Sequence, residues 1–151
     1  MKIYLDTSVI NGNIADDSPW IREATRNFFL MASKPPYTLY LSELVIDEIK
    51  NTSNLTRRAH LEATIDKYSF EILLVNQEAQ SLARQYVQQK IFPEKYFPDA
   101  LHVATAVIHA IPILVSWNFQ HMVKHKIREQ VNLANQNLGY QNIDICSPQE
   151  V

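Results

Sequence analysis

Short apolar runs alternate with apolar residues at helical spacing along this chain of 151 residues. Five runs rich in β-forming side chains predict strands, at residues 3–5, 37–41, 70–75, 112–116 and 143–146, and the first of them is expected to be buried. Between them, apolar residues recurring every three or four positions predict helices, at residues 19–31, 42–49, 55–68, 76–90, 100–110 and 119–137. The chain therefore alternates between predicted strands and predicted helices.

This alternation defines the class of fold that we expect. Parallel strands joined by helices take right-handed crossovers, which place helices on both faces of the sheet. We therefore predict an α/β protein, a three-layer α/β/α sandwich with a central, mainly parallel five-stranded sheet. No repeat, low-complexity tract or linker interrupts the pattern, and the length is typical of one domain, so residues 1–151 are expected to form a single domain.

Composition narrows the setting in which the protein works. Apolar residues make up 46% of the chain, enough for a core, and the formal net charge of -2 disfavours a passive nucleic-acid-coating protein. The only cysteine, Cys146, permits no internal disulfide, which indicates a reducing compartment. Asp6 interrupts the first apolar run after three residues, so we expect no secretory signal. No stretch approaches the roughly 18 to 20 apolar residues that span a bilayer, so we expect no membrane span and a cytoplasmic location.

Functional groups of parallel α/β sheets collect beyond the carboxyl ends of the strands. Several polar side chains lie near these ends in the predicted sheet. They are Asp6 after the first strand, Glu43, Asp47 and Glu48 after the second, Asp99 before the fourth, and Ser116 and Asn118 at its end. If the first and fourth strands are neighbours, these groups converge. Two carboxylates about 4 Å apart repel by roughly 4 kcal/mol at an effective dielectric near 20, so a cluster needs raised pKa values or a cation. Oxygen ligands select Mg²⁺ or Mn²⁺, which suit phosphoryl-transfer chemistry.

Four segments resemble the ordered motifs of PIN domains. Residues 3–10 (IYLDTSVI) are similar to the first motif, and residues 42–49 (SELVIDEI) to the second, in which a glutamate lies six residues after a serine. Residues 97–106 (FPDALHVATA) resemble the third, and residues 113–119 (ILVSWNF) the fourth, where most members carry Thr-x-Asp-x-x-Phe. The resemblance covers essentially the whole chain and is specific only when the four motifs are taken together.

The resemblance implies a PIN-like fold and a metal-dependent endoribonuclease, similar to the VapC-like toxins of type II toxin–antitoxin pairs. It implies that Asp6, Glu48 and Asp99 are catalytic carboxylates that bind Mg²⁺ or Mn²⁺. Asn118 replaces the usual aspartate and brings no charge, which puts a second metal and full activity in doubt. Ser116 replaces the usual threonine and keeps a hydroxyl that can orient water or bond Asp6. The implied partners are an RNA substrate, a small antitoxin and a second copy of the chain, with residues 20–31 as a docking surface.

Each of these residues also has a purely structural interpretation. Asp6 is well placed to cap a turn, and Asp99 follows Pro98 as a good helix N-cap, so only their joint occurrence with Glu48 favours a metal site. Glu43 is the substitute for Glu48 if the register is wrong.

Several other side chains are predicted to be structural or open to either interpretation. His121 and His125 have zinc-like spacing but lack an intervening glutamate, which favours a solvated face, and His102 is expected to be a hydrogen-bonded core residue. Trp117 is either a base-stacking residue or part of the core. The candidates for gripping RNA, which are equally well explained as surface charges, are Lys50, Arg57, Arg58, Lys124, Lys126 and Arg128.

Two other functions compete with the nuclease. Asn118 keeps open a catalytically weakened PIN-fold interaction module that binds RNA or protein without cutting. A phosphatase with a nucleophilic aspartate usually has a second aspartate two residues later, where this chain has Ser8, which disfavours it.

Overall fold

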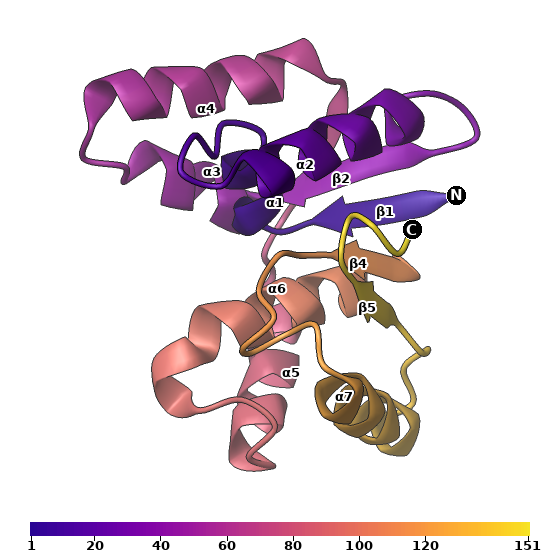
Figure 1. Ribbon diagram of the computed structural model, residues 1–151. Helices are drawn as coiled ribbons and strands as arrows, with labels where there is room; N and C mark the ends of the chain where they lie inside the picture. The colour runs from indigo at the N-terminus through magenta and orange to yellow at the C-terminus, as the bar shows by residue number, and fades with distance from the viewer.

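The computed structural model describes residues 1–151 and contains one five-stranded sheet with helices on both sides (Figure 1). In chain order the elements are β1 (Lys2–Leu5), α1 (Thr7–Gly12), α2 (Pro19–Ala32), β2 (Thr38–Ser42), α3 (Glu43–Lys50), α4 (Leu55–Lys67), β3 (Phe70–Leu73), α5 (Gln77–Gln88), the 3-10 helix η1 (Glu94–Tyr96), α6 (Phe97–Ile108), β4 (Ile113–Val115), α7 (His125–Leu138) and β5 (Asp144–Cys146). None of the helices is both long and apolar enough to cross a lipid bilayer.

The sheet has the strand order β3-β2-β1-β4-β5, and all four pairings are parallel. This confirms the predicted parallel five-stranded sheet. The chain builds β2 and β3 outward on one side of β1, and β4 and β5 outward on the other. The order reverses between β1 and β4, where Leu5 lies opposite Val115. Ligand sites in open parallel sheets form beyond the carboxyl ends of the strands at such a reversal.

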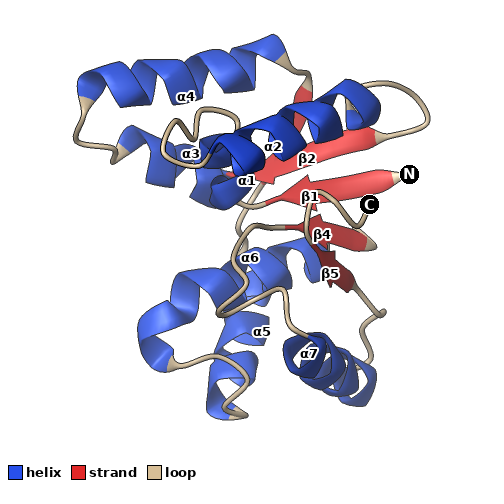
Figure 2. Cartoon of the chain, in the orientation of Figure 1, coloured by secondary structure: helices blue, strands red, loops and turns tan.

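Two hydrophobic cores fill the space between the sheet and its two helical layers. Successive side chains of a strand point to opposite faces, so Tyr4 enters one core while Ile3 and Leu5 enter the other. The first core packs against α5, α6 and α7, and the second against α1 to α4, as Figure 2 shows. Each fully buried Leu or Ile side chain stabilises the fold by about 1.5–3 kcal/mol. The three-layer prediction is confirmed.

Three element boundaries differ from the sequence-based expectations. Residues 7–12 form α1, although their polar start indicated a loop, because the Asp6 carboxylate accepts a hydrogen bond from the Ser8 amide and caps the helix. Helix α7 begins at His125 rather than at residue 119, since the Asn118 side chain holds the preceding residues in a turn by accepting from the His121 amide. Helix α6 begins at Phe97 with Pro98 in its first turn, so Asp99 lies inside the helix and is not its N-cap.

Gly12 lets helix α1 approach α2 and the segment after β4 very closely. A Cβ at this position would lie 2.6 Å from Thr25 Oγ1 and 2.8 Å from Trp117 Nε1. Those two atoms are themselves hydrogen-bonded at 2.9 Å, and Trp117 is only 9% exposed. Of the two interpretations of Trp117, packing in the core is therefore the one observed.

Candidate functional site

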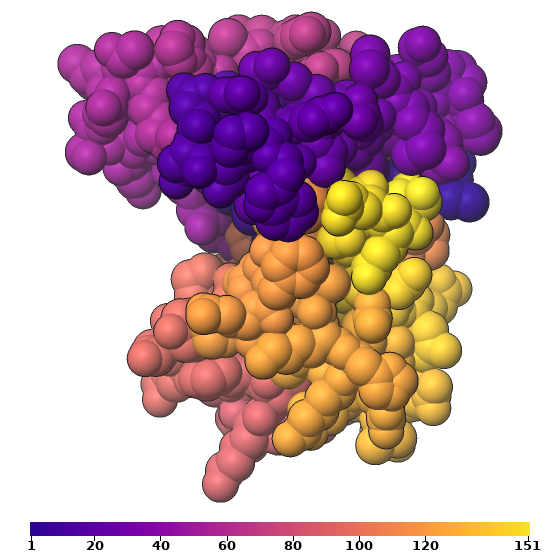
Figure 3. Space-filling model, viewed as in Figure 1, coloured from indigo at the N-terminus to yellow at the C-terminus, as the bar shows by residue number.

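The candidate site lies where β1 and β4 end side by side. Asp6 follows β1 and Ser116 follows β4, so the predicted neighbourhood of the first and fourth strands is confirmed. Ser116 Oγ donates a hydrogen bond of 2.6 Å to Asp6 Oδ2, which is one of the two roles expected for this hydroxyl. In the space-filling view the outline is notched on the left, the side to which the strand ends point, between the α3 half and the α6 half (Figure 3).

Asp6 is a buried carboxylate whose charge has no direct cationic partner. It is 4% exposed, Ser8 donates to its Oδ1 through both amide and hydroxyl, and Ser116 donates to Oδ2. Burial raises the pKa of Asp6, and the nearby Glu48 raises it further, while His102 and the two serines only partly offset this. Asp6 is thus both a helix cap and a group whose ionised form the fold disfavours.

Glu48 is presented by α3 and held by two donors from other elements. Thr7 Oγ1 donates to Glu48 Oε1 at 2.8 Å, and His102 Nε2 approaches the same oxygen at 2.8 Å. Burial raises the pKa of Glu48, but the His102 and Thr7 contacts outweigh it and leave the pKa below its usual value. Glu48 Oε2 accepts no hydrogen bond from the protein and so keeps its lone pairs for a ligand.

Asp99 joins this network through Asn118. The side-chain Nδ2 of Asn118 donates to Asp99 Oδ2 at 3.2 Å, and the backbone amide of Asn118 donates to Ser116 Oγ at 2.9 Å. Burial is the largest effect on Asp99 and raises its pKa; His102 lowers it, the charge of Asp6 raises it again, and His121 and Asn118 lower it by less, so that the pKa stays above its usual value. Asp99, Asn118, Ser116 and Asp6 therefore form one continuous hydrogen-bonded path.

The five predicted site residues share one region, but their carboxylates do not form a ready-made cage. No three His, Cys, Asp or Glu side chains lie close enough together to hold an ion between them. The donor set nevertheless fits a hard cation, because it consists of carboxylate, amide and hydroxyl oxygens, and because the charge of Glu48 helps to raise the pKa of Asp6 and the charge of Asp6 that of Asp99. Mg²⁺ commonly keeps several waters and takes only one or two protein carboxylates directly, so a closed cage is not required.

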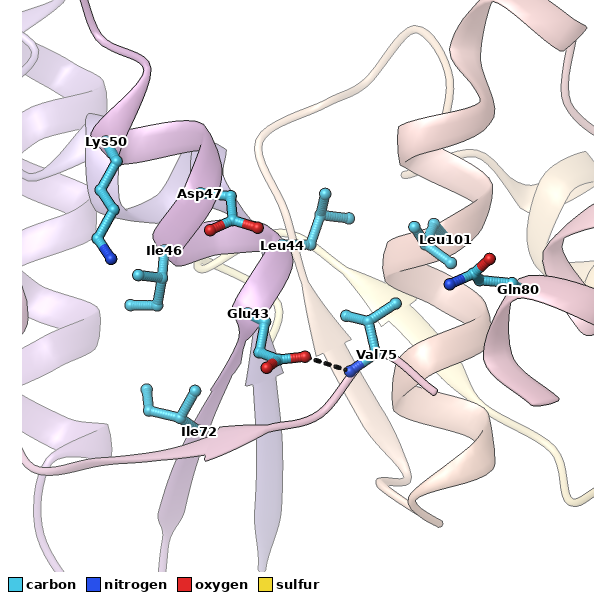
Figure 4. A pocket seen from close by; sticks show the side chains of 9 residues that line it. All are labelled: Glu43, Leu44, Ile46, Asp47, Lys50, Ile72, Val75, Gln80 and Leu101. Carbon is cyan, nitrogen blue, oxygen red and sulfur yellow. Dashed lines mark hydrogen bonds between the residues drawn. The ribbon is translucent and has the colours of Figure 1, made fainter. Parts of the chain in front are cut away.

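The alternative acid Glu43 lies in a different place. Its Oε2 accepts a hydrogen bond from the Val75 amide at 3.0 Å, beside a cavity of about 490 Å³ (Figure 4). The cavity is lined by Glu43, Leu44, Ile46, Asp47, Lys50, Ile72, Val75, Gln80 and Leu101. None of the five predicted site residues lines it. Glu43 therefore has a structural partner, which supports the register that selects Glu48.

The two candidate histidines and the three candidate arginines have local partners. His121 precedes α7 and stacks on Tyr96 at 3.8 Å between ring centroids, whereas the exposed His125 pairs with Glu129, so the two histidines do not share a helix face. Arg128 donates to the Ile145 carbonyl at 2.8 Å. Arg57 donates to Asn11 Oδ1 at 2.8 Å on the α1 side, while Arg58 pairs with Glu62.

Apart from Ser116, sequence reasoning missed the hydrogen-bond partners of the acids. His102 is buried and hydrogen-bonded as expected, but its partner Glu48 was not predicted. The one available signal is its position three residues after Asp99, which puts both on the same face of α6. Thr7 and Ser8 were taken only as motif residues, yet they bond Glu48 and Asp6.

Asp6→Asn is expected to raise the melting temperature of the metal-free protein at neutral pH. Because the pKa of Asp6 in the folded state lies above its usual 3.8, the folded protein holds this proton more tightly than the unfolded chain does. The carboxyl therefore favours folding below its unfolded pKa, and this contribution is lost as the pH rises through the folded pKa. Asparagine should gain about 1 kcal/mol, or about 2–4 °C, near pH 7.5.

Thermal melts in EDTA measure this effect. The advantage of Asp6→Asn should shrink as the pH falls to about 4. The exposed Asp66, changed to asparagine in the same way, is the control and should shift the melting temperature by no more than about 1–2 °C. An advantage that does not change with pH would show that burial of the Asp6 charge is not its cause.

Comparisons with known proteins agree with this architecture. The family model described as "PIN domain" matches residues 3–118, a range that includes all five predicted site residues. A sequence search among curated proteins finds no match.

Three solved structures share the fold at 16% sequence identity. A chain of VapBC2 from Rickettsia felis, bound to a DNA fragment from their promoter, aligns with a TM-score of 0.62 over 97% of this chain and 98% of that one. VapC20 from Mycobacterium tuberculosis, a Sarcin-Ricin loop cleaving toxin, aligns at 0.58 over 79% and 92%. A toxin-antitoxin complex from Klebsiella pneumoniae aligns at 0.57 over 79% and 88%. These likenesses confirm the PIN-like fold.

Proposed function

The chain belongs to the PIN-domain family, and from this premise we propose that it is a Mg²⁺- or Mn²⁺-dependent endoribonuclease that acts as the toxin of a toxin–antitoxin pair. The observation that carries the proposal is that hydrogen bonds through Ser116 and Asn118 link Asp6 to Asp99 where β1 and β4 end, while Thr7, the residue after Asp6, bonds Glu48. Burial and a neighbouring acid raise the pKa of Asp6 and that of Asp99. Uncompensated negative charge of this kind favours a divalent cation.

Within the proposal, Asp6, Glu48 and Asp99 hold the cation, and their neighbours orient them. A bound divalent cation supplies positive charge for the phosphate oxygens and lowers the pKa of water. Ser8 and Ser116 fix the carboxylate plane of Asp6, whereas Thr7 engages one oxygen of Glu48 and leaves the other open. Asn118 orients Asp99 and contributes no charge of its own. The substrate is the phosphodiester backbone of RNA, cut by water.

The proposed partners are suggested by the solved structures of similar fold that are toxin–antitoxin complexes. We expect a small antitoxin that silences the nuclease in the cytoplasm, and a homodimer of this chain. Helix α2 offers an exposed apolar surface for the antitoxin, with Trp20 55%, Leu30 64% and Met31 39% exposed. Light scattering after size exclusion tests the dimer, and a purely monomeric protein would remove that part of the proposal.

Incubation with a panel of structured and single-stranded RNAs tests the activity. Cleavage is expected with Mn²⁺, absent in EDTA and restored when Mn²⁺ is added back, while single-stranded DNA of the same sequences stays intact. Common contaminating ribonucleases act without metal, so the EDTA arm separates them from this protein. If no RNA in the panel is cut in a metal-dependent way, the nuclease proposal fails.

Asn118 supports a second candidate function, a PIN-fold module that binds RNA or protein without cutting it. In that case the uncut RNAs would still bind, and binding would persist in EDTA. Burial of Asp6 and Asp99, whose ionised forms are disfavoured by burial and by a neighbouring acid, is costly for a module without a cation. The nuclease is therefore the primary proposal.

A further inference from the structure

Three buried polar side chains form a hydrogen-bonded series that ends on Glu48. Ser42 Oγ lies 2.7 Å from Tyr4 Oη, Tyr4 Oη lies 2.7 Å from His102 Nδ1, and His102 Nε2 lies 2.8 Å from Glu48 Oε1. These residues come from the end of β2, from β1, from α6 and from α3. Only the last contact, between His102 and Glu48, joins an element of the α5–α7 side to an element of the α1–α4 side.

Burial makes this arrangement costly unless every member is paired. Tyr4 and Ser42 are fully buried, and His102 is 3% exposed. An unpaired buried hydroxyl or imidazole nitrogen costs about 1–3 kcal/mol. No buried side-chain nitrogen or oxygen in the protein lacks a hydrogen-bond partner. A leucine at position 102 would fill a similar space without this requirement, so the packing alone does not explain the histidine.

The donors can be assigned from Glu48 backward. An ionised carboxylate only accepts, so His102 Nε2 carries a proton and donates it to Oε1. When the ring is neutral, Nδ1 accepts from the Tyr4 hydroxyl and Tyr4 Oη accepts from Ser42; when the ring is protonated, Nδ1 donates to Tyr4 Oη and Tyr4 donates to Ser42. In both states Nε2 donates to Glu48, and one ring orientation satisfies all three contacts. His102 is held at both of its nitrogens.

This fixed ring restrains a side chain that is otherwise free to move. The Glu48 side chain is 38% exposed, and an exposed glutamate loses rotamer entropy when it is ordered. His102 also lies one helical turn after Asp99 on α6. The same ring thus sets the placement of Glu48 relative to Asp99, although the two acids are carried on opposite sides of the sheet.

We propose that His102 is a positioning residue that holds Glu48 for the divalent cation through its Nε2–H, with Tyr4 and Ser42 fixing the ring. This proposal rests on the proposed function. Loss of a partner that orients a metal ligand typically weakens metal binding by about 10–100-fold. The role needs only the Nε2–H donor, and so it predicts which substitutions rescue binding.

Two amide substitutions distinguish the role of His102 Nε2 from that of Nδ1. In His102→Gln the terminal NH₂ reaches about as far as Nε2 and can donate to Glu48. In His102→Asn the shorter amide replaces Nδ1 as the partner of Tyr4 but does not reach Glu48. Calorimetric titration with Mn²⁺ should give a dissociation constant within about threefold of wild type for the glutamine variant, and one at least about tenfold weaker for the asparagine variant. Melting temperatures of both, in EDTA, show whether the fold is intact.

The pairing with Glu48 gives a second criterion. In a Glu48→Gln background, His102→Asn should weaken Mn²⁺ binding by no more than about twofold further, because the carboxylate that it positions is already gone. Equal Mn²⁺ affinities for wild type, His102→Gln and His102→Asn would overturn the positioning role and leave the nuclease intact. A wild-type protein that binds no Mn²⁺ would overturn both. Mn²⁺ binding with the predicted variant pattern, but without RNA cleavage, would support the positioning role and refute the nuclease.

Discussion

Glu48→Gln is expected to reduce Mn²⁺-dependent RNA cleavage by about 10²–10³-fold, whereas Glu43→Gln should leave it within about twofold of wild type. The amide keeps an oxygen for Thr7 to bond but removes the charge that Glu48 brings to the cation, and a metal-ligand interaction worth several kcal/mol corresponds to a loss of this size. Glu43 already accepts a hydrogen bond from the Val75 backbone amide, beside the cavity of Figure 4, and so takes no part in the proposed site.

Initial rates on one RNA at saturating Mn²⁺ compare the two variants, which have the same chemical change on the same helix. The melting temperature of each in EDTA controls for folding. If Glu43→Gln abolishes cleavage and Glu48→Gln does not, the register of the second motif is wrong, and the positioning role of His102 falls with it. Equal, small effects of both changes would remove the α3 acids from the site altogether.

The positions of the central strands were predictable because burial on both faces leaves a simple signal, whereas the order of the strands in the sheet was not predicted. Runs such as Ile3-Tyr4-Leu5 and Ile113-Leu114-Val115 are apolar at every position, as the central strands of a parallel sheet require. The ends of helices were less predictable, because single side chains decide them. Asp6 caps α1 and Asn118 stabilises the turn before α7, and neither interaction leaves a periodic trace in the sequence.

The acids of the site were predictable, and most of the side chains that hold them were not. Asp6, Glu48 and Asp99 indicate a site only jointly, because each alone also fits a structural role and their occurrence in three ordered motifs is the signal. Tyr4 and His102 are hidden because they lie within apolar runs, where aromatic side chains are ordinary core residues. Only the register of β1 between β2 and β4 brings the Tyr4 hydroxyl to Ser42 and His102.

The site lies at the boundary between the two halves of the molecule, each built around one of the two cores, and a bound cation would therefore affect stability. Asp6 and Glu48 are carried by the half of the molecule built from α1 to α4, and Asp99 by the half built from α5 to α7. The contacts that join the acids across this boundary are Ser116 with Asp6 and His102 with Glu48. A cation that binds all three acids would therefore stabilise one half of the fold against the other, and would raise the melting temperature as its concentration exceeds its dissociation constant.

Asn118→Asp is expected to make the protein less stable without metal and more active with it. The new carboxylate still accepts from the His121 amide, but it loses the hydrogen bond to Asp99 and faces that acid with a like charge. Repulsion of this kind is worth roughly 4 kcal/mol at about 4 Å and an effective dielectric near 20, and partial exposure of Asp99 reduces it, so we expect a drop of about 3–8 °C in EDTA.

When a cation is bound, the new carboxylate of Asn118→Asp is expected to be favourable, because it then acts as an additional ligand. Mn²⁺ should bind at least about tenfold more tightly to Asn118→Asp than to wild type, and cleavage at low Mn²⁺ should rise by a similar factor. The exposed Asn142, changed to aspartate, adds the same charge away from the site and should alter neither quantity by more than about twofold. If Asn118→Asp destabilises the protein in EDTA but leaves Mn²⁺ affinity unchanged, position 118 does not face the cation, and the site depends on Asp6, Glu48 and Asp99 alone.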